Sequence, residues 1–460
     1  MRPGGRPFVS VIVVSWNASA LLDRCLTCLR DQDHESFEVI VVDDGSDDDT
    51  VEQAVEHLVD ERFTVVRQLL NRGCPAARNL GLRYATGDIV AFIDADGFAH
   101  RGWLTGLVEA FADPTVGGAA SVVFFDGDPL LLNGTGGTIN QQWWAADLNA
   151  LAPLPGAEMP NDILYPMGCG MAVRREALAA VGPFDDRMFN YYDDVDFGVR
   201  IWRAGWRIVV AKSARIDHGF GHSGGAPLRK VLLCEQNRMR VAFKHAAPGA
   251  LVVWVLRELL ATSRAASPRH EIKREALAWN LRHLPSLLRG RLALLGRPRP
   301  PRELFDPSPG ERFVVEPPVG GRPSWDELGA AVVLDEDGSP GLAFGWHAPE
   351  RESDYWFAWA GASSALVFDL DSPAEKLQLR LRQPPWALGP LRLELRSLEQ
   401  PGRAWNFVLV PRGTEWRTQE LPALLPDGRY VLLLSAPAAA PNEPNEARTI
   451  GVAIQSALVA

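Results

Sequence analysis

The sequence contains no run of about 18 uncharged apolar residues, which is the length that a helix needs to cross a bilayer. The nearest approach, residues 250–260, is interrupted by Arg257 and Glu258. The opening residues, MRPGGRPFVSVIVV, also lack the small-residue cleavage site that ends a secretory signal. We therefore expect neither a membrane span nor a signal peptide, and we expect a cytoplasmic location.

Cysteine is scarce, and the spacing of the cysteines does not indicate a disulfide framework. The five cysteines are an odd number at scattered positions, which excludes a regular set of disulfides and suits a reducing compartment. Cys25 and Cys28 form a CxxC pair, but no second pair or neighbouring histidine pair completes a zinc site. Two small apolar residues on one helix face explain this pair better.

Positive charge is in deficit overall but concentrated in one block. The net charge is −10, yet residues 229–302 hold sixteen Lys and Arg against four Asp and Glu. A basic block in an acidic chain indicates a polyanionic partner or a membrane surface. Because the block is helical in pattern and poor in aromatic residues, it favours peripheral contact with an anionic membrane surface over nucleic acid.

The N-terminal half alternates apolar runs with segments of helical spacing. Residues 8–14, residues 37–42 and the run that stops at Asp94 have the continuous apolar pattern of strands buried on both faces. This alternation predicts an α/β domain over residues 1–228, with a mostly parallel, Rossmann-like sheet. Ligands bind at the carboxyl ends of such strands, where several acidic residues fall.

In the rest of the chain the sequence pattern changes twice. Residues 229–297 read as helices, and residues 298–323 are rich in Pro and Gly and read as a linker. Residues 324–460 contain short alternating apolar segments separated by turns, which predicts an antiparallel all-β accessory domain, a sandwich. Its tryptophans could form a glycan-stacking platform, although core packing explains at least two of them more simply: Trp346, Trp356 and Trp359.

The clearest chemical pattern is Asp94-Ala95-Asp96 at the end of an apolar strand. Two carboxylates at i and i+2 can turn toward one hard cation, Mg²⁺ or Mn²⁺, which keeps open positions for phosphate oxygens. Such a metal neutralises a diphosphate leaving group. An acidic turn after a strand is common by itself, but this one follows a fourth strand in a sheet that carries other acids at the same edge.

Two earlier strand ends carry candidate nucleotide contacts. In Asp43-Asp44-Gly45, a carboxylate can accept from a base N–H or a ribose hydroxyl, and the glycine allows the backbone to turn close to a ligand. A solvated turn is the alternative. Trp16 falls at the same edge and could stack on a base, with a place in the core as the rival interpretation.

A third candidate segment precedes a helix. Asn71 and Gly73 could admit a diphosphate near the amides of the helix start, and Arg78 would add a charge-assisted donor. An ordinary loop and helix cap explain the spacing equally well.

The segment Tyr191-Tyr192-Asp193-Asp194-Val195-Asp196 opens an amphipathic helix. Acids in a first helical turn are favourable to the helix dipole, which is a structural explanation. Partly buried carboxylates beside aromatic rings also have raised pKa values and can act as general bases toward an acceptor hydroxyl.

His218 follows a short strand and could be a third metal ligand. From spacing alone a lone histidine is more often not a ligand, and His222 competes for the role.

Earlier in the chain, Trp143 and Trp144 follow a Gly-rich loop, where lining an acceptor site and core packing are equally good explanations.

With these segments taken together, residues 8–222 resemble the family 2 glycosyltransferases of the GT-A fold, and within them the bacterial rhamnosyl- and galactofuranosyl-type enzymes of cell-surface polysaccharide assembly. The resemblance is carried by five pieces in order: VSVIVVSWNA, FEVIVVDDGSDDDT, NRGCPAARNLGLRYATGDIVAFIDAD, GCGMAVRREALAAVGPFDDRMFNYYDDVDFGVRIWRAG and ARIDH. It continues into CEQNRMRVAFKHAAP, which looks like the Arg-Asn-rich helix that follows the catalytic domain in these enzymes.

The resemblance implies roles for the residues that match. Asp43 and Trp16 would lie near the base, Asp94 and Asp96 would form the DxD metal motif, and His218 would complete the metal site, which reverses the expectation from spacing. Asp194 matches the second acid of the family's Glu-Asp pair and would be the catalytic base. The chain departs from that pair in having Asp193 where Glu is commoner.

The resemblance therefore implies an inverting, metal-dependent transfer of a sugar from a nucleotide-diphosphate sugar, with UDP- or dTDP-sugars expected, to a glycan or lipid-linked acceptor. The alternative is a non-catalytic carbohydrate-binding or assembly protein that keeps the fold. The complete set of acids argues against it, since a degenerate site would be free to lose them.

Overall fold

In the computed structural model the chain divides into two compact units. The first contains residues 1–152, 158–265 and 270–311, and most of the second is residues 312–460. None of the described helices is long and apolar enough to span a bilayer. The residues that the structure describes are 7–126, 132–150, 154, 157–219, 227–263, 268–306, 331–333, 342–346, 350–352, 355–370, 373–382, 391–397, 400, 404–409, 417–435 and 452–459.

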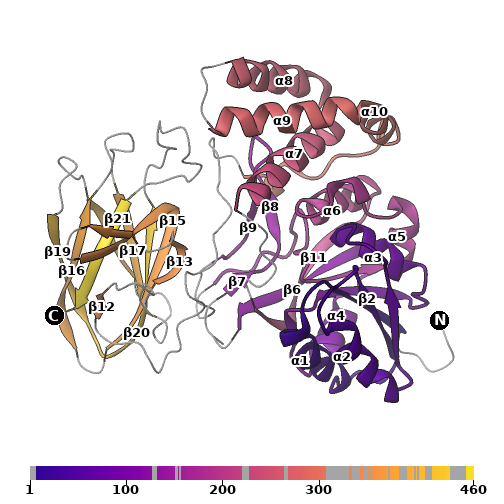
Figure 1. Ribbon diagram of the computed structural model, residues 1–460, viewed down its shortest axis with the longest axis horizontal. Helices are drawn as coiled ribbons and strands as arrows, with labels where there is room; N and C mark the ends of the chain where they lie inside the picture. The colour runs from indigo at the N-terminus through magenta and orange to yellow at the C-terminus, as the bar shows by residue number, and fades with distance from the viewer. Residues whose placement is uncertain are drawn as a thin grey trace. The chain divides into compact units, whose positions relative to one another are not determined.

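A nine-stranded sheet forms the centre of the first unit, in the order β3-β2-β1-β4-β10-β6-β11-β5, with β7 beside β6 (Figure 1). Strands β1 to β4 pair in parallel, and β10 runs antiparallel to both β4 and β6. The predicted α/β architecture is confirmed. The strands of this unit, with the small β8–β9 ribbon, are β1 (Val9–Ser15), β2 (Phe37–Asp43), β3 (Phe63–Arg67), β4 (Ile89–Asp94), β5 (Gly97–Ala99), β6 (Val116–Phe125), β7 (Leu132–Gly134), β8 (Gly137–Ile139), β9 (Ala145–Asp147), β10 (Gly170–Arg174) and β11 (Arg207–His218).

Helices cover this sheet because their apolar faces and the β-branched strands form one core. Every residue of β1 is buried, and Leu22, Leu26 and Leu29 of the first helix pack into the same cluster. The helices and short 3₁₀ turns that accompany the sheet are α1 (Ser19–Arg30), α2 (Thr50–Glu56), η1 (His57–Val59), α3 (Cys74–Leu82), α4 (Trp103–Ala110), α5 (Arg175–Val181), η2 (Asp186–Met188) and α6 (Asp193–Arg203).

The basic helical segment belongs to the same unit, and α7 lies against α6 and α10 (Figure 1). Several of its basic side chains turn inward, including Arg238, Arg240 and Lys244, each of which is buried. The basic block is therefore partly an interior feature, which its sequence did not indicate. Its elements are α7 (Pro227–His245), α8 (Pro248–Ser263), α9 (Pro268–Arg282), α10 (Leu284–Leu292) and η3 (Arg302–Leu304).

The first residues of the predicted linker pack on the N-terminal unit. The amide of Asp306 donates to the carbonyl of Ile139 at 3.0 Å, and the hydroxyl of Thr138 donates to the carbonyl of Leu304 at 2.7 Å. The rest of the linker, residues 307–323, lies outside the described residues.

The second unit consists of antiparallel strands, as predicted, which join in one ten-stranded sheet (Figure 1). Strand β15 is shared between two halves of this sheet, because Ala358–Ala360 pair with β21 and Ser363–Leu370 pair with β20. Leucines at every second position of β16 and β17 are buried in its core. The strands are β12 (Ala331–Val333), β13 (Leu342–Trp346), β14 (Glu350–Glu352), β15 (Tyr355–Leu370), β16 (Ala374–Arg382), β17 (Leu391–Ser397), β18 (Ala404–Leu409), β19 (Arg417–Leu425), β20 (Gly428–Ser435) and β21 (Val452–Val459).

The proposed tryptophan platform lies on β13 and β15, and the side chains of Trp346, Trp356 and Trp359 are outside what the structure describes. It stays a prediction.

Candidate active site

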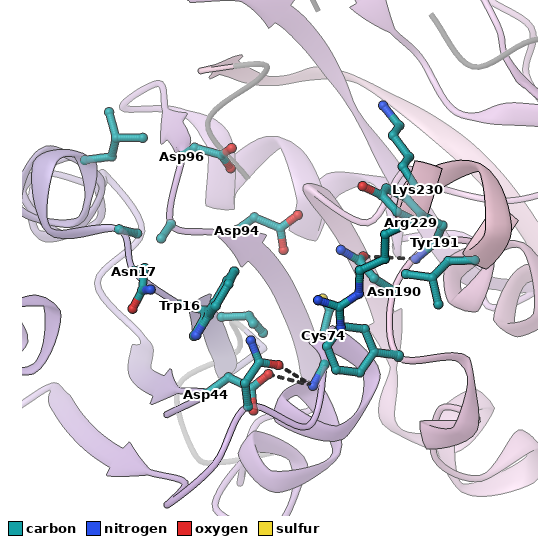
Figure 2. Close-up of a pocket in the computed structure, with 18 residues that line it drawn as sticks. Trp16, Asn17, Asp44, Cys74, Asp94, Asp96, Asn190, Tyr191, Arg229 and Lys230 are labelled. Carbon is teal, nitrogen blue, oxygen red and sulfur yellow. Dashed lines mark hydrogen bonds between the residues drawn. The ribbon is translucent and has the colours of Figure 1, made fainter. Parts of the chain in front are cut away.

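The sheet register brings three strand ends to one edge. Ser15 at the end of β1 pairs with Asp43 of β2, and Val14 pairs with Asp94 of β4. A pocket of about 190 Å³ opens at this edge (Figure 2). Its lining comes from these strand ends, from the loops before α3 and α6, and from the start of α7: Val14, Trp16, Asn17, Ala18, Leu21, Asp44, Asn71, Gly73, Cys74, Asp94, Ala95, Asp96, Phe189, Asn190, Tyr191, Arg229, Lys230 and Leu233.

Asp44 ties the loop before α3 to the end of β2. Its carboxylate accepts hydrogen bonds from the amides of Arg72 at 2.9 Å and Gly73 at 2.7 Å. Burial raises the pKa of Asp44 to about 6, although these two amide bonds act in the opposite direction. The predicted segment around Asn71 and Gly73 is thus fixed at the pocket wall by a carboxylate that also lines it.

Asp43, in contrast, does not line the pocket. It is fully buried, accepts from the amide of Ser46 and pairs with the Arg67 guanidinium at 3.2 Å. Trp16 does line the pocket and leaves 45% of its surface exposed, so it is not a core residue. An exposed aromatic ring at a concave site is suited to stacking on a planar ligand.

Asp94, Asp96 and His218 lie together at the same edge. Strand β11 pairs with β5 so that His218 is opposite Gly97, directly after the acidic turn. The Nε2 atom of His218 lies 3.4 Å from Oδ1 of Asp96, and its Nδ1 atom lies 3.0 Å from Oδ1 of Asn133. Because the Asn133 oxygen can only accept, Nδ1 carries the proton in the neutral ring and Nε2 keeps a lone pair.

The chemistry of these donors fits a hard divalent cation. Carboxylate oxygens and an imidazole nitrogen suit Mn²⁺, and a second residue that fixes the histidine tautomer is typical of metal ligands. Within the described part of the chain, however, no three His, Cys, Asp or Glu side chains are already arranged around a common metal position. Asp94 is instead engaged by Arg78, whose Nη2 lies 3.1 Å from its Oδ1.

Arg78 is a buried bridge between the two groups of acids. Its guanidinium binds Asp94 on β4, Asp193 on α6 and the carbonyl of Gly168. It is only 2% exposed and is not among the lining residues of the pocket. The arginine predicted as a direct diphosphate donor is thus occupied by protein carboxylates, and its contacts are those of a residue that positions Asp94 against Asp193.

The two consecutive acids at the start of α6 have different surroundings. Asp193 is buried and paired with Arg78. Asp194 accepts from the amides of Gly168 at 3.1 Å and Val195 at 2.8 Å. Burial, and then the charge of Asp193, raise the pKa of Asp194 to about 7. Asp194 therefore has the environment of a general base that works near neutral pH.

The loop that leads into α6 has a strained backbone. Phe189, Tyr191 and Tyr192 all have positive φ, between 57° and 67°. Such residues cost about 1–3 kcal/mol each unless their surroundings fix them. Asn237 of α7 supplies the fixing contacts, because its side-chain amide donates to the carbonyls of Met188, Asn190 and Tyr191.

A buried ion network fastens α7 to α6. Asp196 accepts from Nε of Arg200 at 2.9 Å, pairs with Lys244, and lies 2.8 Å from Nε2 of His245. Burial lowers the pKa of His245 to about 4, so its neutral ring donates to the carboxylate. The helix that carries Asp193 and Asp194 is held from behind by α7.

The region proposed for the acceptor joins α6 through Tyr192. The amide of Ala145 donates to the Tyr192 hydroxyl at 3.0 Å, and that hydroxyl donates to the carbonyl of Trp143 at 3.3 Å. Trp144 is buried, and the guanidinium carbon of Arg238 lies 4.8 Å from the centre of the Trp144 ring. Trp144 therefore packs in the interior, whereas Trp143 is half-buried.

Sequence reasoning missed Asn133, Asn237 and the pocket role of Arg229 and Lys230. Asn133 and Asn237 act through contacts with distant segments, for which the linear sequence offers no periodic signal. The sequence places these two cations in the basic block that we expect to contact a membrane surface, whereas in the structure they line the pocket. His222 lies outside the described residues.

Residues 10–182 match the family model described as Glycosyl transferase family 2. Among curated proteins, the pre-mycofactocin glycosyltransferase of Mycobacterium tuberculosis is 30% identical over 55% of this chain and 53% of its own length. The N-acetylglucosaminyl-diphospho-decaprenol L-rhamnosyltransferase of the same species is 26% identical over 57% of this chain and 94% of its own length. The chain thus spans about half the length of the first of these relatives.

Among solved structures, the mannosyltransferase PcManGT from Pyrobaculum calidifontis, in complex with GDP-Man and Mn²⁺, is 22% identical with a TM-score of 0.40, covering 64% of this chain and 87% of that one. The S. aureus protein TarS is 14% identical with a TM-score of 0.41, covering 93% of this chain and 72% of that one.

Proposed function

Residues 10–182 form a family 2 glycosyltransferase domain, and from this premise we propose that the protein transfers a sugar, with inversion, from a nucleotide-diphosphate sugar to an acceptor hydroxyl. The observation that carries the proposal is the buried Arg78 bridge, because it joins the acidic turn at the end of β4 to the acidic start of α6. The bridge thereby holds Asp94, which is proposed to act at the donor, close to the helix start that carries Asp194, the candidate base.

In this proposal the donor nucleotide occupies the pocket at the ends of β1, β2 and β4. Trp16 stacks on the base, and Asp44 and the loop at Asn71–Gly73 form the adjacent wall. UDP- and dTDP-sugars are the donors proposed. A panel of sugar nucleotides, screened for thermal stabilisation in the presence of Mn²⁺, would identify the donor, because a ligand that binds only the folded state raises its stability.

Asp94, Asp96 and His218 would hold Mg²⁺ or Mn²⁺, with Asn133 fixing the histidine tautomer. When bound, the cation would supply positive charge against the diphosphate leaving group. Arg78 would keep Asp94 oriented and its negative charge compensated before the donor arrives.

Asp194 is the proposed base. It takes the proton of the acceptor hydroxyl, the hydroxyl oxygen attacks the anomeric carbon from the side opposite the leaving group, and the nucleoside diphosphate departs with the bonding electron pair. Inversion follows from this single in-line displacement. Asp193, held by Arg78, positions the first turn of α6 and does not itself take the proton.

Asp194→Asn tests this assignment. The variant should lose transfer by at least about a hundredfold while donor binding survives, because only general-base catalysis is removed. The control Asp186→Asn changes an acid in η2 whose side chain is 48% exposed, and should leave turnover near normal. Near-normal transfer by Asp194→Asn would show that the base is elsewhere.

The acceptor is proposed to be a glycan or lipid-linked sugar in cell-surface polysaccharide assembly, with the protein peripheral to the cytoplasmic face of a membrane. The name of the mycobacterial rhamnosyltransferase relative includes a lipid-linked acceptor. Exposed Val252, Val253 and Leu256 lie beside exposed Arg257 on α8, a pattern suited to an anionic bilayer surface. Flotation with liposomes tests this contact, and equal recovery with and without anionic lipid would refute it.

The alternative is a non-catalytic carbohydrate-binding or assembly protein. Hydrolysis of a sugar nucleotide that depends on a divalent metal, even without an acceptor, separates the two, because a binding protein would not release nucleoside diphosphate.

A further inference from the structure

We propose that Arg229 and Lys230, at the start of α7, form a diphosphate-binding subsite on the side of the pocket opposite Asp94 and Asp96. The inference rests on the proposed function and adds to it a pair of cationic residues from the helical segment. Neither the family match, which ends at residue 182, nor the acidic motifs assign these residues a role.

The placement of the two side chains carries the proposal. Both line the pocket, and Figure 2 shows them across the cavity from Asp94 and Asp96, with Arg229 reaching inward from α7. The Arg229 guanidinium carbon lies 4.8 Å from the ring centre of Phe189, and the Lys230 ammonium lies 5.7 Å from that of Tyr191. These aromatic residues belong to the loop whose backbone carbonyls accept hydrogen bonds from Asn237, so both cations lie over rings of a loop that α7 itself holds.

The two signs of charge come from different elements of the pocket, since both cations belong to α7 and the carboxylates lie at or just after the ends of β2 and β4. Arg229 and Lys230 are the two basic residues among those that line it, where they face three carboxylates. Asp44 is bound by two backbone amides and Asp94 by Arg78. A diphosphate placed between the acidic turn and α7 would meet a metal on one side and a guanidinium and an ammonium on the other, the charge-assisted donors that phosphate oxygens accept.

Arg78 cannot fill this role without leaving its partners. Its guanidinium is bound to Asp94, Asp193 and Gly168, and it is not among the residues that line the pocket. Arg229, in contrast, is exposed at the start of α7. We therefore assign the side chains that donate hydrogen bonds to the diphosphate to Arg229 and Lys230 of α7, in place of Arg78 of α3, which the sequence suggested.

Two molecules could bring this diphosphate: the nucleotide sugar, or an acceptor linked to a lipid through a diphosphate. The pocket favours the nucleotide, because Trp16 and Asp44 line the same cavity. Binding of UDP and dTDP represents the first source, binding of farnesyl diphosphate represents the second, and uridine and thymidine report on the base and ribose alone.

The experiment compares the full-length protein with the double variant R229Q/K230Q by calorimetric titration with these probes in the presence of Mn²⁺. We expect the affinity for UDP or dTDP to fall at least about tenfold, as expected for lost charge-assisted hydrogen bonds, while nucleoside affinity is unchanged. A loss confined to farnesyl diphosphate would assign the subsite to the acceptor.

Two further variants separate charge from structure. R83Q/R101Q removes two exposed charges that lie outside the basic helical segment and the pocket, and should bind every probe normally. R229K/K230R keeps both charges and should retain most of the diphosphate affinity. Equal binding of all diphosphate probes by wild type and R229Q/K230Q, or equal losses in R229K/K230R, would overturn the subsite. Failure of the wild type to bind any nucleoside diphosphate would instead overturn the proposed function with it.

Discussion

At the scale of single residues, Asp193 and Asp194 show how neighbours in sequence acquire different chemistry. Asp193 gains a buried guanidinium, whereas Asp194 receives backbone amides and the negative charge of its neighbour. Burial, and then the charge of Asp193, raise the pKa of Asp194 to about 7, where a base can exchange protons at neutral pH, although the Val195 amide acts in the opposite direction.

This difference predicts the pH dependence of catalysis. Burial and Asp193 raise the pKa of Asp194 to about 7, with Arg78 acting in the opposite direction and Asp147 in the same one. Since the base must be ionised, kcat under saturating substrate should fall as the pH decreases through about 7. A kcat profile that stays flat down to pH 5 would show that Asp194 is not the titrating base.

Gly73 offers a second test at this scale. Its φ is +88°, and a Cβ atom there would lie 2.0 Å from the carbonyl oxygen of Phe189. Gly73→Ala should therefore push apart the two loops of the pocket and raise the Kd for the donor, by about tenfold or more.

Gly205 is the matched control, because its φ is +89° and a Cβ atom there would have no atom of the described residues within 4 Å. Gly205→Ala carries the same backbone penalty, about 1 kcal/mol, without the steric contact. Donor affinity that falls equally in both variants would show that the loop contact does not matter for binding.

Sequence reasoning worked well for residues whose role depends on local position. Asp94 and Asp96 could be proposed from the acidic turn at a strand end, whereas His218 was added only by the family resemblance. The β11–β5 register places His218 opposite Gly97, next to that turn. Sequence reasoning worked poorly for Arg78. The spacing located Arg78 near a helix start, but its partners are 16 and 115 positions away in the chain.

At the scale of elements, α7 acts as a support for α6. Asn237 fixes the strained loop before α6, and Lys244 and His245 bind Asp196 one turn into that helix. The residues that support the candidate site therefore extend beyond the sheet and its helices into the basic segment.

Asp196→Asn should lower the free energy of unfolding by about 3–5 kcal/mol, since it leaves Lys244 and Arg200 buried without their carboxylate. Urea denaturation of the variant measures the loss. Asp186→Asn, which removes an exposed acid, should change stability by less than about 0.5 kcal/mol. A variant of Asp196 as stable as wild type would mean that α7 is not held through this network.

Periodicity predicted the elements of the sheet because buried strands such as β1 are continuously apolar. It could not predict that the basic helices would turn Arg238, Arg240 and Lys244 inward. Such side chains are normally solvated, and only their partners, Glu235 and Asp185 among them, make burial possible.

At the scale of the whole molecule, the residues proposed to act in the chemistry all lie in the first unit. The family 2 domain and its α/β fold follow from the sequence, whereas the donor, the acceptor and the metal rest on the proposed site.

The most direct test of the central claim is release of nucleoside diphosphate from a panel of UDP- and dTDP-sugars by the full-length protein, with Mn²⁺ and then with excess EDTA. Turnover of at least one donor should require the metal and should fall by at least about a hundredfold in the double variant D94N/D96N, whose carboxylates would hold it. Equal turnover with EDTA, or in D94N/D96N, would contradict the account, as would no turnover of any donor.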